Sequence, residues 1–373
     1  MELRERYAQV HALLSAVADK AVCEQEEYIK TISSLYSQLE RVKDYLDGKS
    51  AGKFFSNITE DAQARSYLDQ IEKYAGMLRS GQYPFAGRFI ENGATVIDHC
   101  LIKKDELYHL FYIRGKAGFN WSESPTNEFG HAVSADLKKW IALPPVVRSS
   151  EGAFDSYQVW APHIVQKDGK YYMFYTGVNE NAAQTVGVAV SEDLYLWDKY
   201  EGNPLLHTEQ WKYWGASHWS NGRDPMVLED GGIYYMYYTR SRMVGEDLQE
   251  CIGVSSSSDL LHWKDEGTIG VEDSVHLPPE SPFAVKHGGK YYLFYSQYYV
   301  GTCCLVSDSP TKGFCKTDCF VVDKNISASE VFEEDGKYYL TRITHEPNDV
   351  HLFDMRELEF SDGGVCLKGT EKE

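Results

Sequence analysis

The amino-acid sequence predicts an all-β five-bladed propeller preceded by an α-helical region. Two observations support this fold class. The spacing of apolar residues changes from helical to strand-like near residue 82, and a strand–turn–strand unit then returns five times. Hydrophobic residues make up 43% and aromatic residues 14% of the 373 positions, which is enough for a packed core. We therefore divide the chain into a helical, coiled-coil-like region (1–82) and a propeller domain (83–373).

Apolar or small residues in steps of three and four predict helices in the first region. The stripes are Leu3, Tyr7, Val10, Leu14, Val17 and Ala21, then Tyr28, Ile32, Leu35, Leu39, Val42 and Leu46, and, in a second helix, Leu68, Ile71, Tyr74 or Ala75, and Leu78. The second helix is expected from near Thr59 to Gly81. The long seam favours a homodimer joined through these helices, and a hairpin folded against its own chain is the alternative.

The second region repeats one layout, a short strand, a polar turn and an aromatic strand. The repeated segments cover residues 98–113, 161–176, 224–239, 280–296 and 329–343, with aromatic strands beginning at Tyr108, Tyr171, Tyr234, Tyr291 and Tyr338. A small sheet of this kind cannot bury both faces alone, so neighbouring sheets must pack in a closed ring. Five repeats therefore predict five blades around a central channel.

A companion phrase, Ser-x-Asp-Leu-x-x-Trp, follows three of the aromatic strands, at residues 134–140, 191–197 and 257–263. We expect an outer turn in which the aspartate accepts hydrogen bonds from backbone amides. Because the tryptophan recurs at one position of the repeat, we expect it to pack between blades rather than to bind a ligand.

The first residues of the blades should meet at one mouth of the channel, although they lie far apart in the sequence. Asp98, Asp224 and Glu280 are acidic residues at three of these positions. Each acid alone could be a turn residue that starts a strand. Three acids at one mouth should instead have pKa values that are pushed apart, which favours acid–base catalysis of the kind used in glycoside hydrolysis.

Several phrases of the chain resemble a known group of enzymes. They are EFGHAVSADLKKWIALPPVV (128–147), VWAPHIVQKDGKYYMFYTG (159–177), RDP (223–225) and PESPF (279–283). Together they are similar to the five-bladed β-propeller glycosidases, which include glycoside hydrolase families 32, 43 and 68, over roughly residues 90–360. The resemblance implies that Asp98 is the nucleophile or general base, Asp224 the transition-state stabiliser and Glu280 the general acid.

Departures from the family patterns leave the branch and the stereochemistry open. Blade one reads VIDHCL where fructosidases have Asn-Asp-Pro, Ser281 follows Glu280 where that branch has cysteine, and His163 stands where many arabinanases have aspartate. The separation of the Asp98 and Glu280 carboxyl groups would distinguish the two outcomes, roughly 5 Å for retention and about 6.5–9.5 Å for inversion.

A sugar site also needs an apolar floor and hydrogen-bond donors around the acids. Trp160 is the candidate floor, and Arg223 is expected to align a carboxylate or a sugar hydroxyl. His163 is expected to contact the substrate or an ion through water, with a structural role as the alternative. Further candidates for substrate binding, from loops and blade heads, are Trp121, His218, His276 and Glu330.

Composition limits the partners and the compartment. A net charge of −19 argues against nucleic acid, and the lack of an eighteen-residue apolar run argues against a membrane span. The charged first residues do not resemble a secretory signal, so a cytoplasmic location with reduced cysteines is expected. The spacing of the eight cysteines shows no zinc-site pattern.

The favoured function is hydrolysis of a small furanoside or related oligosaccharide, without a required cofactor. The resemblance implies that a structural calcium in the channel is possible. One alternative is a phosphorylase-like propeller enzyme, which would need a cationic phosphate pocket beside a single acid. The other is a non-catalytic propeller that binds sugars or serves assembly.

Overall fold

The structure is a computed structural model of the chain. It describes residues 2–18, 35–36, 39, 42–48, 61–79, 94–116, 126–138, 140–179, 182–207, 222–269, 279–297, 300–324, 328–346, 350–361 and 364–369. Two helices, α1 (Leu3–Ala18) and α3 (Asp61–Arg79), precede the strands. The strands form five antiparallel sheets of four strands each.

Each sheet is built from four strands that are consecutive in the chain. Blade one contains β1 (Ala94–Lys104), β2 (Leu107–Lys116), β3 (Phe129–Ser134) and β4 (Ile141–Leu143). Blade two contains β5 (Gln158–Lys167), β6 (Lys170–Asn179), β7 (Ala182–Ser191) and β8 (Asp198–Lys199). Blade three contains β9 (Arg223–Asp230), β10 (Ile233–Val244), β11 (Asp247–Ser257) and β12 (Lys264–Ile269). Blade four contains β13 (Pro279–His287), β14 (Lys290–Gln297), β15 (Gly301–Ser307) and β16 (Phe320–Asp323), with the 3-10 turn η2 (Lys316–Asp318) before β16. Blade five contains β17 (Glu330–Glu334), β18 (Lys337–Glu346), β19 (Val350–Ser361) and β20 (Gly364–Leu367).

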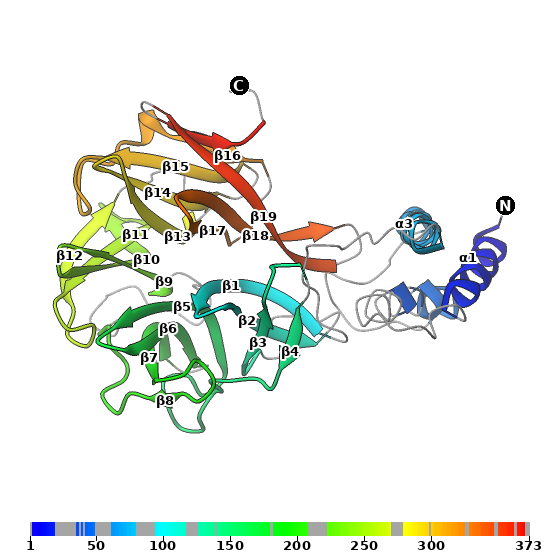
Figure 1. Ribbon diagram of the computed structural model, residues 1–373, viewed down its shortest axis with the longest axis horizontal. Helices are drawn as coiled ribbons and strands as arrows, with labels where there is room; N and C mark the ends of the chain where they lie inside the picture. Colours follow the sequence, from blue (N-terminus) through cyan, green and yellow to red (C-terminus); the bar gives the residue numbers. More distant parts are fainter. Residues whose placement is uncertain are drawn as a thin grey trace.

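The five sheets are arranged around a common axis, with the first strand of each blade innermost (Figure 1). Each innermost strand contacts the next one in order, and β17 contacts β1, which closes the ring. Among the described strands none is exchanged between the first and last blades, so side chains hold this junction together. The predicted five-bladed propeller is confirmed.

The second strand of every blade supplies much of the packing between blades. The strands β2, β6, β10, β14 and β18 each begin one residue before the tyrosine predicted to start them. Tyr112, Tyr175, Tyr237 and Phe294 lie on four of these strands and are almost completely buried. Burial of such large rings is the main stabilising contribution of the repeated aromatic phrase.

The companion phrase forms the expected outer turn. In the second copy, Asp193 Oδ1 accepts hydrogen bonds from the amides of Tyr195 and Leu196 at 2.8 and 2.9 Å. The tryptophan of this copy, Trp197, meets Phe111 of blade one edge to face at 5.7 Å. Trp263 meets Phe174 of blade two in the same way. The prediction of a packing role between blades is confirmed.

The helical region has a core of its own, and Figure 1 shows α1 and α3 outside the ring of sheets. One apolar cluster joins the two helices and the helical residues between them, and its buried members are Leu3, Val10, Leu14, Val17, Leu35, Leu39, Val42, Ala64, Tyr67, Leu68, Ile71 and Ala75. The predicted stripes are therefore buried within a single chain as far as the structure describes them. Ala21, Tyr28 and Ile32, and the side chains of Tyr74 and Leu78, lie outside the described residues. Within the described part of the chain, neither helix has the length and apolarity needed to cross a bilayer.

Candidate active site

The heads of the innermost strands share an unusual backbone. Ala161, Asp224 and Ser281 have φ values of 47°, 56° and 50°, and each precedes a proline. The strand register shifts at these residues, and also at Asp98 in blade one. A bulge of this kind re-aims a side chain, and the following proline removes an amide that the interrupted ladder would leave unpaired. The bulges thus turn the head residues of several blades toward the channel mouth.

Asp224 is held by donors from three directions. Its Oδ2 accepts hydrogen bonds from the Ser281 amide at 3.1 Å and from Thr239 Oγ1 at 3.3 Å, and the Nε atom of Arg223 lies 3.4 Å away. Its own amide donates to Thr176 Oγ1 at 2.9 Å. The carboxylate is 8% exposed and fixed in place, which suits a group that acts by charge and position.

Arg223 links two of the acids. Its guanidinium is 4% exposed and donates from Nη2 to Glu280 Oε1, while its Nε faces Asp224. Glu280 is the more accessible acid of this pair, with 24% of its side chain exposed. The expectation that Arg223 aligns a carboxylate matches this geometry.

Asp98 completes the acidic group from blade one. Burial, followed by the negative charges of Asp224 and Glu280, raises the pKa of Asp98 to about 8, and Arg223 opposes this shift. Three acids from blades one, three and four therefore share one electrostatic environment. The raised pKa favours the protonated form of Asp98 at neutral pH. The three acids then include one proton donor, Asp98, beside the carboxyl groups of Asp224 and Glu280.

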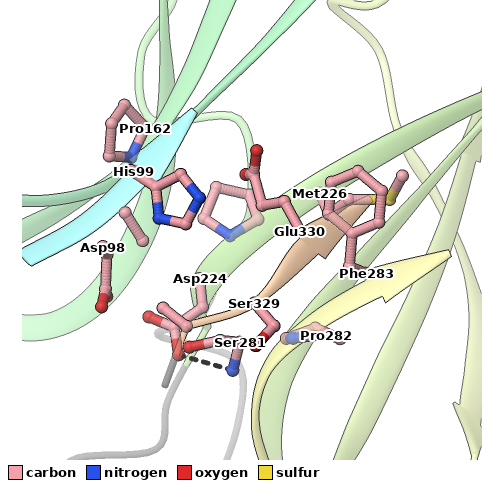
Figure 2. Close-up of a pocket in the computed structure, with 13 residues that line it drawn as sticks. Asp98, His99, Pro162, Asp224, Met226, Ser281, Pro282, Phe283, Ser329 and Glu330 are labelled. Atoms are coloured by element: carbon pink, nitrogen blue, oxygen red, sulfur yellow. Dashed lines mark hydrogen bonds between the residues drawn. The ribbon is translucent and has the colours of Figure 1, made fainter. Parts of the chain in front are cut away.

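A pocket opens beside Asp98 and Asp224 (Figure 2), and Glu280 is not among the residues that line it. The empty space in and in front of it, open solvent included, is about 300 Å³. Asp98, Asp224 and Glu330 contribute carboxyl groups to its wall. The apolar part of the wall comes from the bulge prolines and from Met226 and Phe283. The mixture of apolar surface and a few carboxyl groups fits a small polar organic ligand better than an anion.

Trp160 lies elsewhere than expected. It is 5% exposed, packs in the core shared by blades one and two, and is not part of the pocket wall. Its indole Nε1–H donates to Thr126 Oγ1 and Gln158 Oε1, each at 3.0 Å. These contacts give Trp160 a structural role and correct its assignment as a sugar floor.

His163 and Glu330 lie one step deeper in the channel than the acids. His163 Nδ1 faces Glu330 Oε1 at 3.5 Å, and the His163 ring is buried and does not line the pocket. Glu330 reaches the pocket wall, and burial raises the pKa of its carboxyl group. Trp121, His218 and His276, the remaining substrate-binding predictions, lie outside the described residues.

The sequence interpretation missed two groups at the site. His99 lines the pocket beside Asp98, and its Nε2 hydrogen bonds to Thr341 Oγ1 at 2.7 Å. The hydroxyl residues Thr176 and Thr239 contact Asp224 from within β6 and β10. The signal for the hydroxyl residues was present in the sequence, because the aromatic phrases of blades two, three and four end in Thr, Thr and Ser.

Two family models match the propeller. The model "Glycosyl hydrolases family 32 N-terminal domain" matches residues 99–277, and the model "Glycosyl hydrolases family 43" matches residues 220–359. The two matches overlap, and together they run from blade one into blade five. Each covers less than half of the chain.

Among curated proteins, the chain is similar to plant β-fructofuranosidases. It is 32% identical to an insoluble isoenzyme of Arabidopsis thaliana over 161 residues, 42% of this chain and 25% of the relative. It is 37% identical to the vacuolar acid β-fructofuranosidase 1 of a Rosa hybrid cultivar over 214 residues, 48% of this chain and 33% of the relative. The chain thus covers about a third or less of the length of these two relatives.

Solved structures share the fold at lower identity. A thermostable family-43 glycoside hydrolase has a TM-score of 0.59 at 19% identity, covering 75% of this chain and 95% of that chain. The GH32 β-fructofuranosidase BmSUC1 of Bombyx mori has a TM-score of 0.60 at 20% identity, covering 84% of this chain and 70% of that chain. These likenesses support the propeller fold.

The matching models point to one class of protein. Over residues 99–359 the chain is similar to the five-bladed β-propeller glycosidases, and families 32 and 43 are the two whose models match parts of its sequence. The resemblance seen in the sequence is confirmed at this level.

Proposed function

We propose that the chain is a glycoside hydrolase that cleaves a small furanoside or related oligosaccharide by carboxylate acid–base chemistry. The observation that supports this proposal is the coupling of Asp98, Asp224 and Glu280: Arg223 contacts both Asp224 and Glu280, and burial followed by the charges of these two acids raises the pKa of Asp98. Glycosidic cleavage needs one carboxyl group that gives a proton and another that attacks or activates water.

The proposed roles follow the resemblance. Asp98 is the nucleophile or general base, Glu280 protonates the leaving oxygen, and Asp224 stabilises positive charge on the sugar ring. In the free protein the proton of the group resides on Asp98, and Glu280 is paired with Arg223. To act as the general acid, Glu280 must carry the proton. We therefore expect that sugar binding weakens the Arg223–Glu280 ion pair and that the proton moves from Asp98 to Glu280.

β-Fructofuranosides are the first substrates to examine. Two of the most similar curated proteins are named as β-fructofuranosidases. Arabinosides, xylosides and galactosides belong in the same panel, because solved relatives include an arabinanase and a β-xylosidase.

The test is a product screen over this panel with the wild-type chain, Glu280→Gln and Asp98→Asn. We expect sugar release by the wild type and a loss of about 10³-fold or more in each variant. Asp308→Asn is the matched control, since its side chain is 86% exposed, and it should keep full activity. The proposal is wrong if either site variant keeps near-normal turnover on the substrate that the screen identifies.

The same screen separates the two alternatives. A phosphorylase would require inorganic phosphate, whereas Arg223, the described cation nearest the acids, is already engaged by two carboxylates. We therefore expect the same rate with and without phosphate. A sugar-binding propeller without catalytic function would bind one of the panel sugars and release no product.

A further inference from the structure

A second layer of side chains lies in the channel one step below the acids. Each blade contributes one residue to this layer, and the five are Cys100, His163, Met226, Phe283 and Glu330. In the strand register these residues stand opposite equivalent positions of the second strands, which are Phe111, Phe174, Tyr237, Phe294 and Thr341. Met226 and Phe283 are apolar, whereas the other three carry atoms that can bind a metal ion.

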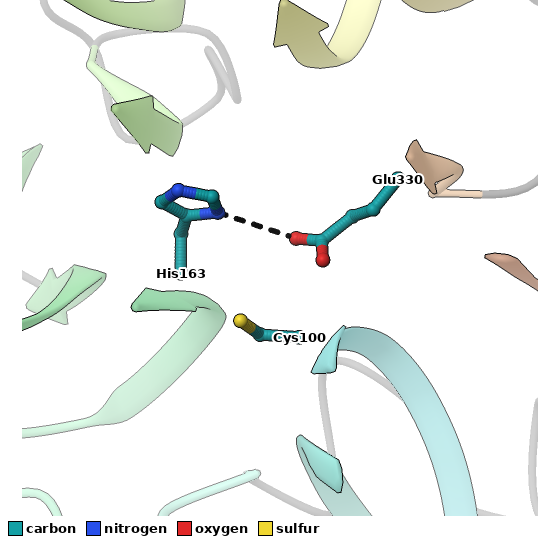
Figure 3. Close-up of side chains that lie close together, drawn as sticks. All are labelled: Cys100, His163 and Glu330. Carbon is teal, nitrogen blue, oxygen red and sulfur yellow. Dashed lines mark ion pairs between the residues drawn. The ribbon is translucent and has the colours of Figure 1, made fainter. Parts of the chain in front are cut away.

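These three side chains point at one another from blades one, two and five (Figure 3). Cys100 Sγ, one imidazole nitrogen of His163 and one carboxylate oxygen of Glu330 all lie within 4.8 Å of one another. Cys100 and His163 are buried, and 16% of the Glu330 side chain is exposed. Within the described part of the chain, this is where three potential metal ligands meet.

The hydrogen bonds of His163 leave one nitrogen available. Its Nε2 lies 3.2 Å from the carbonyl oxygen of Val227, which can only accept, so Nε2 carries a hydrogen. The buried Nδ1 is left to face Glu330 Oε1 at 3.5 Å, and in the neutral form of the ring it is a bare acceptor. Two acceptors at this distance need a cation or a proton between them. A backbone carbonyl on the far nitrogen is also the usual support of a metal-bound histidine.

The other two side chains are supported in a similar way. The backbone at Ile164 hydrogen bonds to the Cys100 sulfur, and the backbone at Leu101 hydrogen bonds to the Glu330 carboxyl group. Phe283 packs edge-on against the His163 ring with the centroids 5.6 Å apart. All three candidate ligands are thus oriented by neighbours before any ion arrives.

The donor types identify the kind of ion. Calcium takes six to eight oxygen ligands, and this layer offers one carboxylate, so the calcium that the resemblance implies does not fit these residues. A thiolate, an imidazole and a carboxylate are the ligands of zinc. We propose that Cys100, His163 and Glu330 form a zinc site in the propeller channel.

The geometry suits a tetrahedral ion. Zinc bonds of about 2.0–2.3 Å place neighbouring ligand atoms about 3.3–3.6 Å apart. The His163–Glu330 separation of 3.5 Å already meets this requirement, and the Cys100 sulfur needs to approach by about 1 Å at most. Glu330 also lines the pocket, so a pocket water can take the fourth position.

The charges balance when the ion binds. Cys100 and Glu330 each release a proton, and their two negative charges neutralise Zn²⁺ in a buried site. The ion then ties blade one to blade five, a junction that no described strand crosses. Without an ion, the competing state holds one proton between Glu330 and His163 Nδ1.

The experiment measures metal content and ligand type in the full chain. We expect about one equivalent of zinc after dialysis against metal-free buffer. Cobalt(II) added to metal-free protein should give a tetrahedral spectrum with a thiolate-to-cobalt charge-transfer band. Cys100→Ser should abolish that band and weaken zinc binding at least 100-fold, and Glu330→Gln should weaken binding while keeping the band.

Two other thiols provide controls. Cys304→Ser alters a buried thiol, and Cys315→Ser alters an exposed one, and neither should change the cobalt band. If Cys100→Ser does not fold, the contrast between Glu330→Gln and Cys315→Ser decides the matter. The proposal is overturned if the wild type neither contains zinc nor takes it up at micromolar concentration. It is also overturned if the band survives in Cys100→Ser or is lost in Cys315→Ser.

Discussion

Asp98 has a pKa of about 8 in the folded chain, well above the ordinary value of 3.8. The unfolded chain therefore loses this proton near pH 4, whereas the folded chain keeps it until about pH 8. Between these values the unfolded state gains stability relative to the folded state as the pH rises. Asp98 thus favours unfolding at neutral and alkaline pH, as expected of an acid held in place for function rather than for stability.

We predict that Asp98→Asn makes the folded chain more stable at pH 8, by on the order of 2–5 kcal/mol. The difference from wild type should shrink as the pH falls and vanish below about pH 3, where Asp98 is protonated in both states. Urea unfolding at pH 4, 6 and 8 measures it, with Asp308→Asn as the control. A variant that is less stable than wild type at pH 8 would contradict the assigned environment of Asp98.

Thr239 is a positioning residue, because it acts on the reaction through Asp224. We predict that Thr239→Val lowers kcat roughly tenfold, equivalent to about 1.4 kcal/mol, with little change in KM. Thr239→Ser keeps the hydroxyl group and should restore most of the rate. Steady-state kinetics with melting curves measures both effects. Equal losses in the two variants would indicate a packing role instead.

The residues of the site were only partly predictable from the sequence. Asp98, Asp224 and Glu280 were found because their acidic character recurs at one position of a repeat. The burial of Trp160 was not predicted, because the hydrogen bonds of its indole to Thr126 and Gln158 depend on the folded structure.

At the scale of elements, the repeat fixed the strand starts closely, but the bulges were not predicted. A positive φ is not visible in residue type when alanine, aspartate or serine adopts it. The proline that follows each of these residues was the available sign, because proline in an innermost strand requires an interrupted ladder. The apolar stripes correctly identified the buried faces of the helices. They did not show that these faces pack against one another within a single chain, because that depends on the tertiary structure.

In the part of the chain that the structure describes, the core of the helical region consists of residues from helices, so we expect it to unfold separately from the propeller. We predict that Leu14→Ala lowers the stability of this region by about 2–5 kcal/mol while the propeller keeps its own transition. Far-ultraviolet circular dichroism follows the helices, and near-ultraviolet circular dichroism follows the propeller aromatics. Leu13→Ala, at a half-buried position of the same helix, should have a smaller effect. A single shared transition in all three proteins would contradict this prediction.

A homodimer through the N-terminal helices remains a proposal. The stripe residues that suggested it are buried within one chain, so an interface would have to use other faces of the helices. Sedimentation of the full chain and of residues 83–373 tests it. The proposal predicts a dimer for the first and a monomer for the second, and a monomeric full chain would contradict it.

At the scale of the whole molecule, the ring explains why distant segments share one site. The strand heads are separated by tens of residues in sequence, yet closure brings them to one mouth. The sequence predicted this meeting from the repeat alone. It did not predict the meeting of Cys100, His163 and Glu330. These residues occupy equivalent positions of their strands, but they are of three different types and so do not stand out as a repeated pattern.

The most direct test of the central claim is a crystal structure of Asp98→Asn with the oligosaccharide that the product screen identifies. We predict that the scissile bond lies between residue 98 and Glu280, with the glycosidic oxygen within hydrogen-bond distance of the Glu280 carboxyl group. A sugar bound away from this mouth, or bound with its anomeric carbon beyond reach of residue 98, would contradict the account.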